Sequence, residues 1–244
     1  MNSFLIALQF ITTIPVKKEL KYSEKEIAHS MIYYPLVGSI LGLVLVLINL
    51  IGSKLLPDLV SSSLLLMFFV LLSGGIHLDG LADSFDGFLG GKNKKEILSI
   101  MRDSSIGVYG VLAVFLILIF KFTLLIELPI ARKNMILIIV PTISRWAMVL
   151  AVYLFPYARK EGFGKAYKLY LKKKHVLAAT VWVLLLTLIL FFWKGALVLG
   201  VSFLIIWLIG EFITRKIDGL TGDNYGAINE IMEVAVLLLM ILFY

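Results

Sequence analysis

Long apolar stretches separated by short polar joints run along most of the chain. Each reaches or approaches the roughly 18 to 20 residues that a helix needs to cross the hydrocarbon core of a bilayer. They lie near residues 36–55, 59–76, 106–126, 134–155, 176–193, 195–213 and 227–244. The pattern predicts an all-α, polytopic membrane helical bundle with about seven transmembrane helices. The range is six to eight, because the short joints at 54–58 and 194–195 could instead mark re-entrant hairpins.

Composition agrees with this class of protein. Apolar residues make up 60% of the 244 residues and charged residues 16%, whereas an average soluble domain has roughly 25% charged residues. The absence of cysteine excludes disulfides, thiolate metal sites and a cysteine nucleophile. The N-terminal 15 residues lack the basic start and small-residue cleavage site of a secretory signal. We therefore expect one integral membrane domain over residues 1–244, surrounded by membrane lipid.

The basic residues predict the orientation of this domain. If the N-terminus is cytoplasmic, the inside segments are 1–35, 77–105, 156–175 and 214–226. They hold 17 of the 23 lysines and arginines, and the outside segments hold only Lys54, Arg132, Lys133 and Lys194. This is the distribution that the positive-inside rule describes, so the net charge of +7 reports topology and no nucleic-acid partner is expected. The prediction is a multi-pass protein of the cell membrane, whose motif loops 77–105 and 214–226 share the cytoplasmic side.

The first of these loops carries an acidic cluster. Asp79, Asp83 and Asp86 are spaced i, i+4 and i+7, so a helix would place all three carboxylates on one face. Such carboxylates repel one another unless a divalent cation lies between them. Hard oxygen ligands of this kind suit Mg²⁺, which proteins normally hold with a few carboxylates and substrate phosphates. His77, just upstream, is placed to orient a carboxylate or a phosphate.

The alternative for this segment is a solvated polar loop between two spans. That alternative explains the charge but not its arrangement, because no basic residue lies between Asp79 and Asp86. In a helix, Leu78, Leu81 and Phe85 would also fall together on the opposite face. An apolar stripe opposite a line of carboxylates is typical of a helix that continues into the bundle.

A second cluster precedes the span that starts near residue 106. Ser104 or Ser105 can cap the helix that begins there, and the free N–H groups of a helix start attract phosphate. Arg102 can add a charged donor to the same anion. The alternative is an ordinary capped helix with no ligand.

A third cluster, residues 218–227, leads into the last span. That span carries Glu230 and Glu233 on one helical face in its first turns. Carboxylates that enter lipid are costly unless they are paired or bound to metal, so a functional role is the default hypothesis. The alternative is that both lie at headgroup depth and reach water there.

Two cations lie inside predicted spans, and each needs an anion or a polar cavity. Arg145 is the better candidate for a substrate phosphate, because its planar guanidinium matches phosphate oxygens. For Lys121, snorkelling to an interface is an equally good interpretation. The basic loop 156–175 is more typical of an anchor to anionic lipid than of a ligand site.

Four separated motifs of the chain resemble one known family, the adenosylcobinamide-GDP ribazoletransferases, also called cobalamin synthases. The motifs are Tyr33–Gly38, Gly74–Gly87, Ile100–Gly110, and Gly219–Asp223 with Gly226, Ala227 and Glu230. They follow the order of the family and extend over residues 33–230. The departures are small: Tyr34 stands where phenylalanine is more common, and Ser84-Phe85 occupies a variable pair.

The resemblance implies a reaction and a set of site residues. It implies transfer of the phosphoryl-cobinamide moiety of adenosylcobinamide-GDP to the ribose hydroxyl of α-ribazole or α-ribazole 5′-phosphate, giving adenosylcobalamin or its phosphate and GMP. Mg²⁺ is the implied cofactor. The expected metal ligands are Asp79, Asp83 and Asp86, with Asp103 or Asp223 completing the sphere. The general base is left open between His77, Asp86 and Glu230, and the expected substrate contacts are Arg102, Ser104, Arg145 and Thr221.

Two other functions have to be weighed against this one. A CDP-alcohol phosphotransferase also uses aspartate clusters at helix ends, but its pattern requires an Ala-Arg pair that Asp79-Gly80-Leu81-Ala82-Asp83 lacks. A cation-coupled transporter would show corresponding broken spans in two halves of the chain, and the sequence shows none. The sequence leaves a homo-oligomer open.

Overall fold

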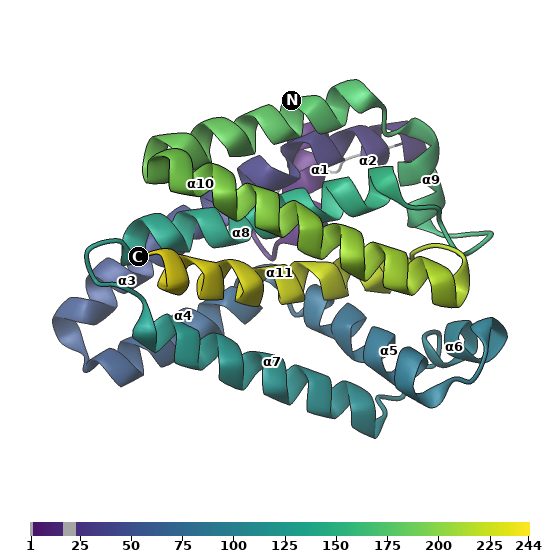
Figure 1. Cartoon of the computed structure of the whole chain (residues 1–244), viewed down its shortest axis with the longest axis horizontal. Helices are drawn as coiled ribbons and strands as arrows, with labels where there is room; N and C mark the ends of the chain where they lie inside the picture. Colours follow the sequence, from purple (N-terminus) through teal and green to yellow (C-terminus); the bar gives the residue numbers. More distant parts are fainter. Residues whose placement is uncertain (1, 17–22) are drawn as a thin grey trace.

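The structure is a computed structural model that describes residues 2–16 and 23–244, and in this part of the chain it consists of helices joined by short connections. The helices are α1 (Asn2–Ile11), α2 (Glu24–Ser30), η1 (Met31–Tyr33), α3 (Tyr34–Leu55), α4 (Asp58–Ser73), α5 (Ile76–Gly90), α6 (Lys94–Ile100), α7 (Val108–Glu127), α8 (Lys133–Leu154), α9 (Phe163–Tyr170), α10 (Lys173–Ile217) and α11 (Gly222–Phe243). The predicted all-α polytopic bundle is confirmed (Figure 1).

Five helical segments of the described chain are long and apolar enough to cross a membrane. They are residues 24–55, which end in α3, and the helices α7, α8, α10 and α11. At 45 residues α10 is too long for one crossing, since a helix rises about 1.5 Å per residue. It breaks at Phe192, whose φ is 52°, and folds back on itself (Figure 1). The spans expected at 176–193 and 195–213 are therefore the two arms of one hairpin, with the break slightly earlier than expected.

A second break separates α4 from α5. The span expected over 59–76 is shorter in the structure, because α4 ends at Ser73. Gly74 and Gly75 both have positive φ, 65° and 74°, a backbone conformation that side chains with a Cβ rarely adopt. Helices α4 and α5 meet at 86°. They are long and apolar enough to cross a membrane only when taken together as one bent segment. The bend directs α5 away from the path of α4.

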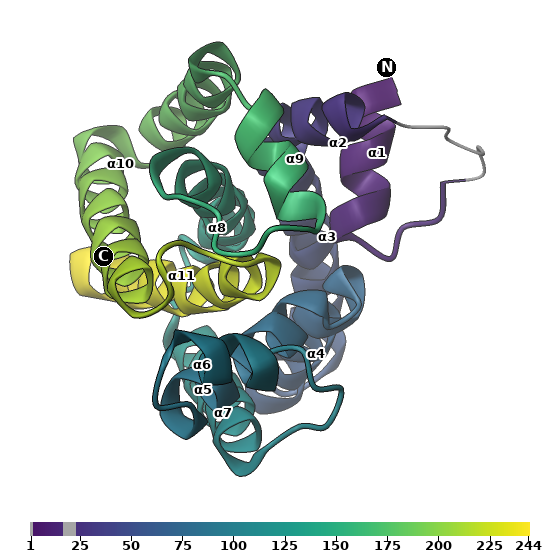
Figure 2. The same ribbon diagram turned by 90° about the vertical axis from the view of Figure 1, so that its right-hand side faces the viewer.

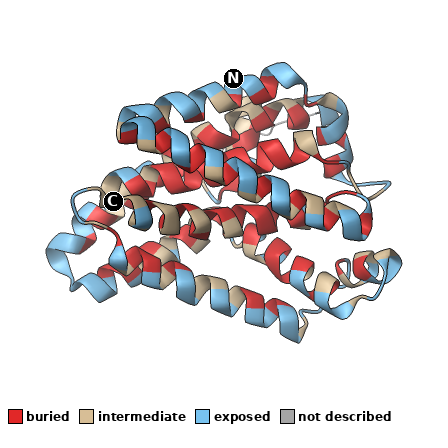
Figure 3. Cartoon of the chain, in the orientation of Figure 1, coloured by how far each residue is buried: buried red, intermediate tan, exposed pale blue. Residues whose placement is uncertain are grey.

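Helix α8 forms the centre of the bundle. Sixteen of its 22 residues are buried, and in the end-on view it lies between α3, α9, α10 and α11 (Figures 2 and 3). Two glycines of α3 allow a close approach: a Cβ on Gly42 would lie 2.5 Å from the Cα of Ile138, and one on Gly38 would lie 2.7 Å from the carbonyl carbon of Pro141. The outer helices instead expose large apolar side chains such as Leu116 of α7, as expected for a surface in lipid.

The polar connections gather at the two ends of the bundle. At one end Lys94 Nζ lies 3.0 Å from Asp218 Oδ2, and the backbone N–H of Leu220 donates to the carbonyl of Pro156 at 2.8 Å. Three of the four predicted inside segments thus meet. At the other end, Arg132 and Lys194 both lie 4.3 Å from the ring of Tyr244. The grouping of basic residues by end agrees with the sequence-based topology. Three of the N-terminal lysines, Lys17, Lys18 and Lys21, lie outside the described residues.

Candidate functional site

The acidic motif forms a helix, as expected, and this helix lies directly against α11. Glycines on both helices make the approach close. A Cβ on Gly80 would lie 2.6 Å from the carbonyl oxygen of Asp223, and one on Gly226 would lie 3.2 Å from the Cα of His77. The contact therefore places His77 and Asp79 of α5 beside Asp223, the first acidic residue of α11. Residues separated by more than 140 positions in the chain are brought to one place.

A cavity of about 360 Å³ lies at this contact, and we call it the polar cavity. Residues from α1, α3, α5, α8, α9, α11 and the 156–162 loop line it. Its polar side chains are His77, Asp79, Tyr157, Arg159, Asp223, Tyr225, Tyr34 and Tyr167. Arg159 Nη2 donates to Asp223 Oδ2 at 2.8 Å and to the Met101 carbonyl at 3.3 Å. One turn further along α5, Asp83 lies within electrostatic reach of Asp223 and Asp79.

Three residues that line the polar cavity each carry a buried polar atom with no hydrogen-bond partner in the described chain. They are His77 Nδ1, Arg159 Nε and Tyr225 Oη. An unpaired buried polar group costs roughly 1–3 kcal/mol, so native proteins rarely keep several in one place without a reason. Their convergence on the same cavity as Asp79 and Asp223 indicates a binding site for a polar ligand.

A second cavity, of about 580 Å³, adjoins the first and is basic. We call it the basic cleft. Its charged lining residues are Lys94, Lys95, Arg102, Arg159, Lys160 and Glu161. Arg159 lines both cavities. Arg102, one of the two arginines predicted from the sequence to bind phosphate, lies in this cleft. A cleft with this excess of cations favours a ligand that carries phosphate groups.

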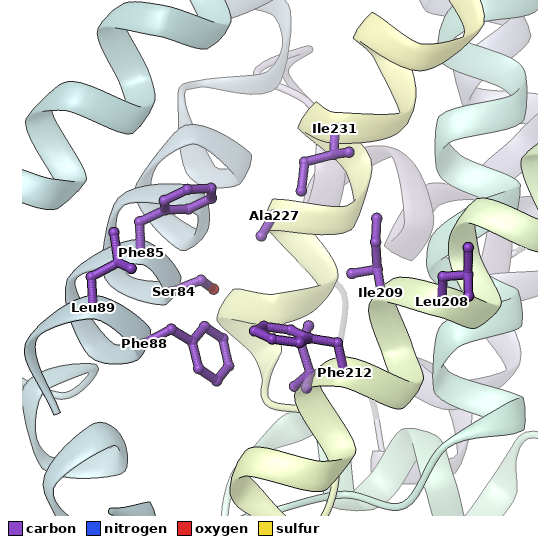
Figure 4. A pocket seen from close by; sticks show the side chains of 10 residues that line it. Ser84, Phe85, Phe88, Leu89, Leu208, Ile209, Phe212, Ala227 and Ile231 are labelled. Atoms are coloured by element: carbon purple, nitrogen blue, oxygen red, sulfur yellow. The ribbon is translucent and has the colours of Figure 1, made fainter. Parts of the chain in front are cut away.

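A third cavity, of about 390 Å³, lies between α5, α10 and α11 and is apolar (Figure 4). Side chains such as Phe85, Phe88 and Phe212 surround it. Ser84 is its one polar lining residue, and Ser84 Oγ already accepts a hydrogen bond from Asn224 Nδ2 at 2.9 Å. With no titratable group in its lining, this cavity lacks the means for acid–base or phosphate chemistry.

The structure separates Asp86 from Asp79 and Asp83. The Asp86 carboxylate accepts hydrogen bonds from the backbone N–H groups of Gly107 at 2.7 Å and of Gly110 at 2.9 Å, where α7 begins. The expectation that Ser104 or Ser105 caps this helix is therefore wrong, because a carboxylate from α5 supplies the anion instead. Ser104 is exposed, and this helix start is already occupied by a negative charge.

Asp103 also lies away from the polar cavity. It is exposed, and its Oδ1 accepts a hydrogen bond from the backbone N–H of Ser105 at 2.9 Å. Together with Asp86 it lines a separate cavity at the start of α7. Of the five predicted metal ligands, Asp79 and Asp223 line the polar cavity, Asp83 lies one turn further along α5, and Asp86 and Asp103 line the separate cavity at the start of α7.

The charges inside the predicted spans form a buried quartet of Lys121, Arg145, Glu230 and Glu233, all at most 3% exposed. Lys121 Nζ donates to Glu230 Oε2 and to Glu233 Oε2, both at 2.6 Å, and Arg145 Nη1 donates to Glu233 Oε1. The glutamates were expected to be either paired with cations or bound to metal, and here they are paired. The headgroup-depth alternative and snorkelling by Lys121 are both wrong, because the side chains are buried beside one another.

The quartet changes what Arg145 and Glu230 are free to do. The guanidinium of Arg145 is paired with Glu233 and shielded from solvent, so it is not available to a substrate phosphate in this arrangement. The expectation that Arg145 binds phosphate is corrected on this ground. Glu230 is paired with Lys121 and does not line the polar cavity.

Thr221 is completely buried and caps α11. Its backbone N–H donates to Asn224 Oδ1 at 2.9 Å, and its Oγ1 accepts from the Asn224 N–H at 3.3 Å. The same hydroxyl lies 3.3 Å from Asp223 Oδ2. Thr221 therefore acts on the site by holding the turn that presents Asp223.

Three lining residues, Tyr157, Arg159 and Tyr225, were not predicted from the sequence. Arg159 was interpreted as part of a lipid-anchoring loop, because charge counts do not reveal that the loop folds back. The loop is held against the α11 turn by the bridge between Tyr157 and Leu220, in which the Ala158 N–H donates to the Leu220 carbonyl at 2.9 Å. Burial raises the pKa of Tyr157, so its phenol keeps its proton and can donate a hydrogen bond.

The donor set in and beside the polar cavity fits Mg²⁺ by its chemistry. Asp79 and Asp223 line the cavity, Asp83 lies one turn further along α5, and all three offer hard oxygen atoms whose negative charges act on one another. Asp223 forms an ion pair with Arg159. In the described part of the chain no three histidine, aspartate or glutamate side chains already converge as a complete ligand set. Substrate phosphates and waters normally supply the remaining ligands of Mg²⁺.

Fold and site together define a polytopic membrane protein with a polar cavity and an adjoining basic cleft at one end of the bundle. The chain belongs to the cobalamin-5-phosphate synthase family, whose sequence model matches residues 3–241. The adenosylcobinamide-GDP ribazoletransferase of Desulforamulus reducens is 38% identical, over 99% of this chain and 96% of that protein. Proteins of the same name from Pseudomonas fluorescens and Clostridium botulinum are 36% and 33% identical, over 100% and 98% of their lengths and 100% and 99% of this chain. No solved structure matches the chain.

Proposed function

We propose that the protein transfers the phosphoryl-cobinamide group of adenosylcobinamide-GDP to a ribose hydroxyl of α-ribazole or its 5′-phosphate and releases GMP. The observation that carries the proposal is the junction at Arg159, where a cavity with three aspartates nearby meets a basic cleft. The hydroxyl oxygen forms a bond to the cobinamide-linked phosphorus. The bond from that phosphorus to the bridging oxygen breaks, and the oxygen leaves with GMP.

The basic cleft is suited to the diphosphate of the donor. Arg102 and Arg159 provide planar donors for phosphate oxygens, and Lys94 and Lys95 add positive charge. Breaking a diphosphate places negative charge on the leaving phosphate, and fixed cations lower the barrier by stabilising that charge. Arg159, which faces both cavities, is placed between the leaving group and the acceptor.

Asp79, Asp83 and Asp223 are the residues that would hold Mg²⁺, which when bound neutralises charge on the phosphate oxygens. Asp83→Asn is expected to raise the Mg²⁺ concentration needed for half-maximal GMP release by about tenfold or more, because one anionic ligand is lost. A Mg²⁺ titration of the purified variant measures this. Asp58→Asn, at the opposite end of the bundle, is the control. An unchanged Mg²⁺ requirement in Asp83→Asn would remove that residue from the metal site.

His77 is the best-placed of the three candidates for the base that takes the hydroxyl proton. Its Nδ1 has no partner among the described residues and its side chain lines the polar cavity, whereas Asp86 and Glu230 are engaged elsewhere. His77→Gln keeps a polar side chain of similar reach and is expected to lower kcat by about 10²–10⁴-fold. Single-turnover kinetics at saturating substrates measure the effect, and a kcat within threefold of the parent protein would exclude this role.

The direct test of the reaction is acceptor-dependent release of GMP. The purified full chain in lipid nanodiscs is incubated with adenosylcobinamide-GDP and Mg²⁺, with and without α-ribazole. We expect GMP and the cobalamin product to form in equal amounts, and only when the acceptor is present. Release of CMP from a CDP-alcohol, or no turnover of the cobinamide substrate with either acceptor form, would overturn the proposal.

We also propose that the end of the bundle with both cavities faces the cytoplasm of a cell whose plasma membrane holds the protein. The positive-inside distribution supports this, and the chain has no cysteine, so single cysteines can be labelled cleanly. In intact cells, a membrane-impermeant maleimide should label Lys54→Cys at the α3–α4 turn. It should label Lys216→Cys, at the cavity end of α10, only after the membrane is opened. The reverse pattern would contradict the orientation.

A further inference from the structure

We infer that the polar cavity binds the acceptor nucleoside, with its flat aromatic base held among the tyrosine side chains. The inference rests on the proposed function and adds to it a place and an orientation for the acceptor. We call the four side chains concerned the tyrosine wall: they are Tyr34, Tyr157, Tyr167 and Tyr225. They come from α3, the 156–162 loop, α9 and α11, so the fold gathers them from four separate segments.

The size of the polar cavity suits the smaller substrate, the acceptor nucleoside, and not the larger donor. Sites for small molecules have volumes of roughly 300–1,000 Å³, and the polar cavity, at about 360 Å³, lies at the lower end. This suits a nucleoside of one base and one ribose. A corrinoid joined to a guanosine diphosphate is several times larger and has to lie mainly outside it. The basic cleft, which shares Arg159 with the polar cavity, is an adjoining space with charges that match the diphosphate of that larger substrate.

The chemistry of the tyrosine wall suits an aromatic base. Aromatic side chains stack on the faces of nucleobases with little dependence on the base, and a phenol adds a polar tip. Tyr34 Oη and Tyr167 Oη lie 3.2 Å apart and are partners of each other. Tyr225 Oη, in a side chain only 3% exposed, has no partner in the described chain. A ligand atom in the cavity would satisfy it, for example a ring nitrogen of the base or a ribose oxygen.

Two glycines lie close against the ring of Tyr157. A Cβ on Gly164 would lie 2.7 Å from Cδ2 of the Tyr157 ring, and one on Gly162 would lie 2.7 Å from its Oη. Gly162 also has a φ of 114°, which other residues rarely adopt. The two glycines therefore let the ring lie against the loop backbone. An alanine at position 164 would push the ring out of this position without removing any group of the tyrosine wall.

This placement also orients the acceptor. The lining of the cavity combines the four tyrosines with His77, Asp79 and Asp223. A base among the tyrosines leaves the ribose near the acidic residues and His77. Its hydroxyl then faces Arg159, beyond which the basic cleft begins. Transfer requires the acceptor oxygen to reach the donor phosphorus on the side opposite the leaving oxygen, and Arg159, which lines both cavities, marks where the two substrates would meet.

Equilibrium dialysis tests the inference without relying on turnover. Radiolabelled α-ribazole is dialysed against the full chain in nanodiscs, in the absence of donor. We expect Tyr157→Ala, Tyr225→Phe and Gly164→Ala each to weaken binding by about tenfold, since a stacking face, a hydrogen bond or the ring position is lost. Tyr170→Phe, on α9 like Tyr167 but outside the cavity lining, is the matched control and should bind as the parent protein does. Equal binding by all four variants would overturn the inference.

Steady-state kinetics separate this inference from the reaction itself. In the cavity variants, KM for α-ribazole should rise by about tenfold, while KM for adenosylcobinamide-GDP should stay within twofold. A rise in the donor KM alone would place the guanine base, and not the acceptor, against the tyrosine wall and so overturn the inference. If the parent protein releases no GMP at all, the proposed function fails, and the dialysis result still decides whether the cavity binds a nucleoside.

Discussion

Replacing Arg159 with alanine is expected to lower kcat for GMP release by about 10²–10⁴-fold while the protein remains inserted and folded. Arg159 is the residue that lines both the polar cavity and the basic cleft. Its Nη2 donates to Asp223 at 2.8 Å, while its Nε has no partner in the described chain and can donate to a ligand. The variant removes a cation from the point where the leaving phosphate gains charge, so the loss should fall mainly on kcat.

The measurement is single-turnover formation of GMP with both substrates saturating. Arg215→Ala is the matched control, because Arg215 is exposed, pairs with Glu211 in α10 and lines neither cavity. Arg159→Lys keeps the charge but not the planar fork and should recover only part of the rate. If Arg159→Ala changes the amount of inserted protein but not its kcat, the residue is a lipid anchor, as the charge pattern of its loop suggests.

The role of Arg159 also shows where sequence-based reasoning reaches its limit. Apolar stretches indicate spans directly, because the bilayer sets their length. Basic residues likewise indicate directly which loops lie at which end of the bundle. Arg159 differs because its neighbours depend on a loop that pairs with Leu220, more than 60 residues away. No periodicity of residues 156–175 carries that information, so the loop looked like any other basic connection.

The acidic helix gives a second example. Periodicity correctly predicted a helix with Asp79, Asp83 and Asp86 on one face. Residues on one face of a helix can still contact different neighbouring helices. Seven residues advance a helix by about 10 Å, and over that distance the helix that faces α5 changes. Asp79 lies beside α11, whereas Asp86 meets Gly107 and Gly110 at the start of α7. Spacing along one helix cannot predict which partner lies opposite each turn.

The sequence predicted that the charged residues inside the spans need counterions, but not which residues supply them. Each ionic side chain inside a span needed a counterion, and the sequence indicated as much for Lys121, Arg145 and Glu233. The choice between a substrate phosphate and a second side chain depends on tertiary contacts between α7, α8 and α11, whose members lie 88 to 112 residues apart. In the structure, Lys121 and Arg145 are paired with glutamate side chains. Arg159 and Arg102 instead line the basic cleft.

Glu233→Gln is expected to destabilise the folded protein strongly, because it neutralises the carboxylate that two buried cations share. Glu233 contacts both Lys121 and Arg145 at a site that is 2% exposed. The neutral amide would leave these two cations with only Glu230 between them. Removing one partner of a buried ion pair typically costs about 3–5 kcal/mol, because the remaining charge stays desolvated. For a chain of this size, that corresponds to a fall in the unfolding midpoint on the order of 10 °C.

Thermal unfolding followed by tryptophan fluorescence measures the effect, and a paired variant tests its cause. The combined replacement Lys121→Met and Glu230→Leu removes one cation and one anion and leaves Arg145 paired with Glu233. If uncompensated charge is the cause, this double variant should unfold closer to the parent protein than Glu233→Gln does, although it changes two buried residues. An equal or larger loss in the double variant would mean that packing, and not charge balance, dominates. Because the double variant lacks Glu230, acceptor-dependent GMP release by the folded protein would also exclude Glu230 as the general base and leave His77 and Asp86 as the candidates.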